Sequence, residues 1–184
     1  QDKKISNWKY QGGIIDIITA LVDHHGVLRQ LYQNSENDPA VFEEFTRHLV
    51  VHHTMEEKYF YDLLEQIATQ RHDALEAVNE HHIIELIIKD AEGFPPEHEN
   101  FPIKIEGLGE YTTHHLDEEE AEIFPAARQV FSDEDLNTLG KLFLDAKEKL
   151  LGIVLPEVPG GTGTSGGKAG KIVSYGLGIG SLKK

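Results

Sequence analysis

Apolar residues recur every three or four positions along the chain up to about Pro156, which is the spacing of one face of an α-helix. Glycine and proline stand between these blocks rather than within them, and the alternation typical of β-strands is scarce. The pattern predicts four long helices and a fifth, over about residues 13–32, 38–68, 73–92, 103–124 and 132–151. Because short connections join the long helices, we expect an all-α fold, an antiparallel up-down four-helix bundle with a fifth C-terminal helix.

Local signals support these helix boundaries. Asp38 supplies a capping oxygen, and Pro39 stands at the first helical position, where its missing N–H does no harm. The third helix is expected to stop before Pro95, because proline cannot donate a helical hydrogen bond. Ser132, followed three residues later by Asp135, resembles a capping box that opens the fifth helix.

The composition changes after Pro159, because nine of the 17 glycines of the chain lie from Gly160 onward. Mixed with Ser, Thr and Lys, they predict a flexible linker over residues 156–176. Residues 177–184, LGIGSLKK, differ again because apolar residues are separated there by small ones. We therefore expect a helical domain over residues 1–155, then the Gly-rich linker, then this terminal segment.

Charge and composition exclude several classes of function. The 184 residues include 17 Lys plus Arg against 32 Asp plus Glu, a formal net charge of −15 with histidine neutral. This acidic balance argues against nucleic acid and anionic membranes as partners. Apolar runs fall short of the roughly 20 residues that span a bilayer, so a cytoplasmic location is the default expectation. Without cysteine, any metal must be bound by His, Asp or Glu, and the chain has 11 histidines.

Eight of the 11 histidines stand in adjacent pairs. Six of the 11 have a glutamate four residues later, a spacing that puts both side chains on one helix face, within reach of one metal. A histidine on an apolar face is more often a hydrogen-bonded core residue, but doublets on every long helix favour a metal site. The four doublets, each on a different long helix, are His24/His25, His52/His53, His81/His82 and His114/His115.

The apolar stripe of each helix indicates which member of a doublet points into the core. In the first helix, His24 is in line with Leu21 and Leu28. In the second helix His52 is favoured, although a competing line of apolar residues runs through His53. The inward candidates are then His24, His52, Glu56, His81, His115 and Glu119, while His25, His53 or Tyr111 could orient ligands and His48, His72 and His98 are expected at the surface.

Two segments echo each other along the chain. HHTMEEKYFYD from His52 and HLDEEEAEIFP from His115 both place an aromatic residue nine positions after the histidine, at Tyr61 and Phe124. We expect the second and fourth helices to form equivalent halves of one site. Burying their inward glutamates as bare carboxylates would cost several kcal/mol each, for which a pair of divalent cations would compensate.

The quoted segments, together with DHHGVLRQL from Asp23 and EHHIIEL from Glu80, resemble the four signature segments of the hemerythrin-like, or HHE, cation-binding domain over about residues 12–128. The resemblance implies a non-haem di-iron centre, two oxo- or hydroxo-bridged iron ions that bind dioxygen or react with small oxidants. With Glu56 and Glu119 as bridges, the ligands that it implies are His24, His52, Glu56, His81, His115 and Glu119.

The third helix departs from the family pattern. Oxygen-carrying hemerythrins have a second histidine four residues after the first, where this chain has Glu85. A hard carboxylate in that position would favour ferric iron. Stable reversible oxygenation is therefore less expected, and oxidative turnover or iron binding is favoured.

The terminal LGIGSLKK of residues 177–184 resembles the cargo-loading peptide that directs enzymes into encapsulin nanocompartments. The resemblance implies an encapsulin shell protein as partner and a location inside such a compartment in the cytoplasm. The linker before it has a reach of roughly 25 Å by random-coil scaling, which suits tethering.

We therefore expect an encapsulated di-iron protein that binds or reduces dioxygen, peroxide or nitric oxide, in protection against oxidative or nitrosative stress. The alternative is a non-catalytic oxygen carrier or sensor, or an iron-binding cargo. A single stoichiometric reaction with peroxide would indicate such a binder, whereas many turnovers per chain would indicate an enzyme. A third interpretation is a helical interaction protein with incidental doublets. The fifth helix could pair two chains in a homodimer or close one end of the bundle, because it carries Leu136, Leu139, Phe143 and Leu150.

Overall fold

The computed structural model describes residues 15–35 and 38–152. The predicted linker over residues 156–176 and the terminal segment over residues 177–184 lie outside the described residues, as does the predicted start of the first helix at residue 13. Within the described part all regular structure is helical, which confirms the predicted all-α class.

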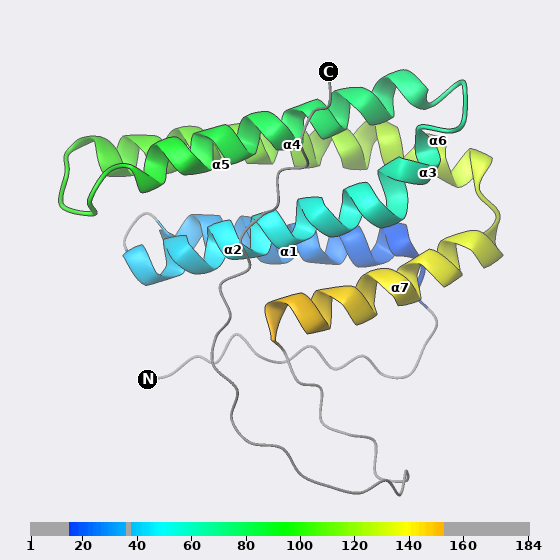
Figure 1. Ribbon diagram of the computed structural model, residues 1–184, viewed down its shortest axis with the longest axis horizontal. Helices are drawn as coiled ribbons and strands as arrows, with labels where there is room; N and C mark the ends of the chain where they lie inside the picture. Colours follow the sequence, from blue (N-terminus) through cyan, green and yellow to red (C-terminus); the bar gives the residue numbers. More distant parts are fainter. Residues whose placement is uncertain (1–14, 36–37, 153–184) are drawn as a thin grey trace, which may run out of the picture. The chain divides into compact units, whose positions relative to one another are not determined.

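The bundle is formed by four long helical rods, and the second and fourth are each interrupted by one π-helical segment. Figure 1 shows the rods running alternately in opposite directions, as predicted for an up-down bundle. The elements are α1 (Ile17–Ser35), α2 (Pro39–Glu56), η1 (Glu57–Tyr61), α3 (Asp62–Leu64), α4 (Arg71–Glu92), α5 (Asn100–Glu118), η2 (Glu119–Ile123), α6 (Phe124–Val130) and α7 (Asp133–Leu151).

Three helix starts follow from capping side chains. Asp38 accepts a hydrogen bond from the backbone N–H of Ala40 with Pro39 in the first turn, as predicted. The predicted capping box of Ser132 and Asp135 opens α7. Asp16 caps α1, because its Oδ1 accepts from the backbone N–H of Thr19 at 3.0 Å.

The predicted end of the fourth helix at Phe124 was wrong. The helical path continues through Pro125 to Val130, because the wider turn of η2 ends at Ile123 and a new helix begins at Phe124. Proline is tolerated in the first turn of a helix, where its missing N–H has no intrahelical partner. The same reasoning explains why α5 begins at Asn100, before the predicted start.

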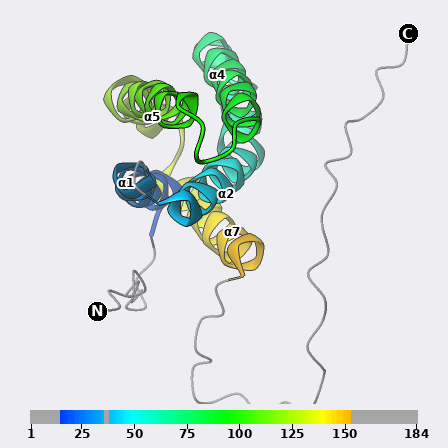
Figure 2. The same cartoon turned by 90° about the vertical axis from the view of Figure 1, so that its left-hand side faces the viewer.

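Helix α7 lies along α1 and α2, on the side away from α4 and α5 (Figure 2). Its Leu136 and Phe143 belong to the same apolar cluster as Ile17 of α1. Gly140 permits the close approach, since a Cβ atom there would lie 2.1 Å from the carbonyl oxygen of Ile15. The fifth helix therefore covers a side of the bundle rather than its end.

Two apolar clusters occupy the two halves of the bundle. One includes Leu21 of α1 and Phe60 of η1, and the other includes Leu28 of α1 and Ile84 of α4. Between them, on every rod, lies a layer of buried histidines and glutamates. None of the helices over residues 15–35 and 38–152 is long and apolar enough to cross a membrane.

Candidate metal centre

Seven buried histidine and glutamate side chains from all four rods meet in the polar layer between the two apolar clusters. Each has 0% of its surface exposed. Their metal-binding atoms form overlapping groups in which all atoms lie within 4.8 Å of one another. The seven residues, which we call the His/Glu cluster, are His25, His52, His53, Glu56, His81, His115 and Glu119.

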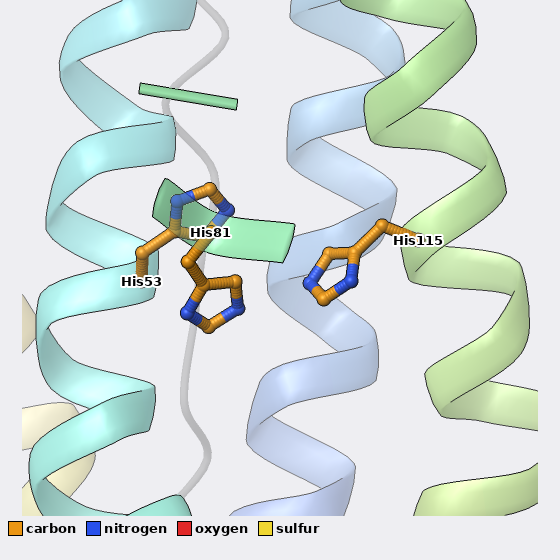
Figure 3. Close-up of side chains that lie close together, drawn as sticks. All are labelled: His53, His81 and His115. Carbon is orange, nitrogen blue, oxygen red and sulfur yellow. The ribbon is translucent and has the colours of Figure 1, made fainter. Parts of the chain in front are cut away.

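Three histidines form one end of the His/Glu cluster (Figure 3). The rings of His53 and His81 are stacked with centroids 3.9 Å apart, and the ring of His115 points toward them from α5 at 4.8 Å from His81. At the other end, Nε2 of His25 lies 3.0 Å from Nε2 of His52. The cluster thus offers one set of three imidazoles and one set of two.

The two glutamates lie between these sets. Glu119 turns Oε1 toward Nε2 of His115 at 3.2 Å and Oε2 toward Nε2 of His25 at 3.3 Å. Oε2 of Glu56 lies 3.3 Å from Nε2 of His52 and 3.6 Å from Nε2 of His81. Each carboxylate therefore faces both histidine sets, as a ligand shared by two metal ions would.

Many polar atoms of the His/Glu cluster lack a hydrogen-bond partner. Both ring nitrogens of His53, both carboxylate oxygens of Glu56 and Nε2 of His115 are buried and unpaired. Buried polar atoms are nearly always hydrogen-bonded, and an unpaired one costs about 1–3 kcal/mol. Bound cations would supply the missing partners, so the residues present fit a pair of metal ions.

The electrostatics of the His/Glu cluster also favour bound cations. Burial, reinforced by the charge of Glu119, raises the pKa of Glu56 well above its usual value. Burial also acts to raise the pKa of Glu119, but the charge of His115 outweighs it and holds this pKa well below the usual range. Two carboxylates in one dry site cannot both be ionised without added positive charge, which metal ions would provide.

Carboxylates behind the cluster fix the orientation of three histidines. Nδ1 of His25 contacts Oε1 of Glu120 at 2.8 Å, Nδ1 of His81 contacts Oε1 of Glu57 at 3.0 Å, and Nδ1 of His115 contacts Oε2 of Glu80 at 2.7 Å. A proton on Nδ1 leaves the lone pair on Nε2, which faces the cluster in each case. This is the arrangement of metal-binding histidines.

The structure brings together five of the six residues predicted as ligands, namely His52, Glu56, His81, His115 and Glu119. His24 is buried but lies behind His52, against His48 and Phe143. The cluster instead contains His25, which was expected only to orient ligands, and His53, which the sequence left as the alternative to His52. Glu85 is half-buried, and among the described residues it belongs to none of the groups.

One further expectation differs from the structure, and one residue has a contact that the sequence did not predict. His48 was expected at the surface but is only 7% exposed, because α7 covers this side of α2. Tyr61 was noted as an aromatic position, yet its Oη donates a hydrogen bond to Oε1 of Glu119 at 2.6 Å. The echo between the two segments was the signal for Tyr61, since it placed an aromatic side chain at a fixed distance from each histidine. Tyr111 is half-buried on α5.

Comparisons with known proteins concern the family and the fold. The model of the family described as Hemerythrin HHE cation binding domain matches residues 16–127. The crystal structure of a hemerythrin HHE cation-binding domain-containing protein from Mycobacterium kansasii is similar, with a TM-score of 0.67 and 23% identity, over 75% of this chain and 88% of that chain. At that identity the likeness concerns the fold. The search of curated proteins found no match to this chain.

Proposed function

The chain belongs to the hemerythrin HHE cation-binding domain family, and from this premise we propose that it is a non-haem di-iron protein that binds or reduces dioxygen, peroxide or nitric oxide. The observation that carries the proposal is the set of buried, unpaired histidine and glutamate atoms in the His/Glu cluster. The purpose that fits this chemistry is protection against oxidative or nitrosative stress.

The proposed ligands differ from those expected from the sequence at both ends of the cluster. His53, His81 and His115 would hold one ion, and His25 with His52 would hold the other. Glu56 and Glu119 would be ligands available to both ions. The interatomic distances support this division, because each glutamate faces a histidine of both sets. His25 and His53 enter the ligand set, and His24 leaves it.

The donor set suits iron. Imidazole and carboxylate ligands bind iron well, and the chain has no cysteine that would favour a soft metal. The iron pair supplies the electrons for reduction when bound. The set with two histidines has fewer protein ligands than the set with three, so it leaves more room for a small molecule. Phe124, stacked on His25 at 5.6 Å between ring centroids, keeps water from this end.

The position of Glu85 changes the balance between oxygen binding and turnover. The sequence placed a carboxylate where oxygen carriers have histidine, but Glu85 is half-buried and His53 supplies the third imidazole from α2. The ligand set then has five imidazoles without a third carboxylate. Reversible binding of dioxygen and reduction of peroxide are both compatible with this donor set.

We also propose that residues 177–184 dock the protein in an encapsulin shell. Support for this part comes from the sequence LGIGSLKK and from the Gly-rich stretch before it.

Elemental analysis tests the iron pair. The full chain, expressed with iron available, is expected to contain about two iron ions, because two histidine sets share two carboxylates. Glu119→Gln removes one shared carboxylate charge and is expected to lower the content to well below two. Glu122→Gln, on the exposed side of η2, is the matched control. A folded helical chain without bound metal would contradict the proposal.

A further inference from the structure

Two buried histidines on the α7 side of the His/Glu cluster have no role in the proposed function. His24 has 0% and His48 has 7% of its surface exposed. Nδ1 of His52 lies 3.1 Å from Nδ1 of His24, and Nε2 of His24 lies 3.2 Å from Nδ1 of His48. The three rings form a chain that leads from the cluster outward, which we call the imidazole chain.

The direction of every hydrogen bond in the imidazole chain follows from one condition. If Nε2 of His52 binds metal, its ring proton is on Nδ1 and is donated to Nδ1 of His24. His24 must then carry its own proton on Nε2 and donate it to Nδ1 of His48. His48 in turn carries its proton on Nε2, which lies 3.9 Å from Oε1 of the exposed residue Glu44. Each ring has one defined tautomer, and each is neutral.

The surroundings keep these rings uncharged. The ring of Phe143 in α7 packs edge-on against both His24 and His52, with centroids 6.4 Å away in each case. Burial, together with the positive charges of Arg47 and Lys147, lowers the pKa of His48 to about 4. Because Nδ1 of His24 accepts the hydrogen bond from His52, it carries no proton, so the acceptor that faces His52 is a neutral imidazole.

This acceptor differs from those behind the three histidines that face carboxylates. His25, His81 and His115 each turn Nδ1 toward a glutamate. A carboxylate that accepts this hydrogen bond makes the imidazole a more basic ligand, whereas a neutral imidazole does so much less. Within the set of two histidines, His25 would thus be the stronger donor and His52 the weaker.

We propose that His24, held in place by His48, is a positioning residue that fixes the tautomer of His52 and keeps it a weak donor to the metal. The inference rests on the proposed function. It assigns to the imidazole chain the control of metal affinity and of reduction potential at the end of the cluster that has two histidines.

Three substitutions of His24 test the inference in the full chain loaded with ferrous iron. Oδ1 of Asn or Asp occupies nearly the same place as Nδ1 of His, so Asn offers a neutral acceptor and Asp a charged one. His24→Leu removes the acceptor and is expected to lower the iron affinity about 10–100-fold. His24→Asn is expected to restore most of that affinity at the wild-type reduction potential, while His24→Asp shifts the potential to a more negative value.

Chelator competition measures the affinity, a spectroscopically monitored redox titration measures the potential, and circular dichroism checks the fold. His82→Leu, a substitution of an exposed histidine on α4, is the control for the change of residue type. The inference is overturned if Asn and Leu lower the affinity equally, or if Asn and Asp give one potential. If the Leu variant fails to fold, the difference in reduction potential between the Asn and Asp variants still tests the inference. A wild-type chain without iron overturns both the proposed function and the inference, whereas equal behaviour of wild type and variants overturns the inference alone.

Discussion

Adjacent residues on an α-helix point about 100° apart, so a helix that is covered on one side buries only one member of a doublet. This holds for α4 and α5, where His82 and His114 are exposed while His81 and His115 are buried. On α1 and α2, both members of each doublet are buried, because α7 covers the side that faces away from the bundle interior. The apolar stripe could therefore select the correct histidine on α4 and α5, but not on α1.

We expect the imidazole of His53 to be needed for one of the two metal ions. His53→Leu keeps the side chain apolar and of similar size but removes one of three imidazoles, so the metal content should fall from about two ions to about one per chain. Glu85→Gln is the matched control and should leave the content unchanged, because Glu85 belongs to none of the described groups. Elemental analysis of both variants checks this. Loss of metal in the Glu85 variant alone would contradict this assignment and would make Glu85, rather than His53, the metal ligand.

At the scale of secondary structure, a π-helical segment begins directly after or at the glutamate of each echoed segment. η1 begins directly after Glu56, and η2 begins at Glu119. Such segments are common at functional sites because the extra residue in the turn re-aims the side chains that follow. Here Tyr61, at the end of η1, reaches Glu119 of the other half, and Phe124, directly after η2, stacks on His25. The echo in the sequence thus corresponds to a repeated local structure.

We expect the side chain of Asp16 to stabilise the start of α1. It caps α1, and its carboxylate also pairs with Arg128 of α6 at 3.0 Å. Asp16→Ala should lower the free energy of unfolding by about 1–2 kcal/mol, and Asp16→Asn by less, because Asn still accepts a hydrogen bond. Burial acts to raise the pKa of Asp16, but hydrogen bonds from Thr19 and Arg128 outweigh it and lower the pKa.

The charge of Asp16 therefore stabilises the fold fully above the ordinary carboxyl pKa of 3.8, and this contribution is lost as the pH falls through the lower folded value. Urea unfolding at a series of pH values should show the wild type and Asp16→Asn converging in acid. Asp145→Asn, an exposed acid of α7, serves as the control. A difference between wild type and Asp16→Asn that stays constant with pH would contradict the assignment.

At the scale of the whole molecule, the His/Glu cluster lies between two apolar clusters that involve all four rods. The ligands come from α1, α2, α4, α5 and η2, so the site exists only when the rods are packed together. Docking in a shell, in contrast, is proposed to depend on a short segment after the Gly-rich stretch. The two functions should therefore be separable by deletion.

Deletion of residues 177–184 is expected to separate shell docking from metal binding. It should abolish co-purification with a co-expressed encapsulin shell protein while the metal content stays at about two ions per chain. The matched control deletes the same number of residues within the Gly-rich stretch, 160–167, and should still load. Size-exclusion chromatography followed by mass spectrometry of the shell fraction measures loading. Persistent loading without residues 177–184 would show that the docking proposal is wrong.

The sequence by itself determined the helices, their up-down order and the layer in which the histidines and glutamates meet, because helical periodicity and capping depend on residues only a few positions apart. It placed His52, Glu56, His81, His115 and Glu119 in that layer, where the structure brings them together. Only the tertiary structure decided between His24 and His25, because the answer depends on how far α7 wraps around α1. The contacts from Tyr61 to Glu119 and from His24 to His48 were decided there too, since each joins separate helices whose rotation about their own axes is fixed by packing.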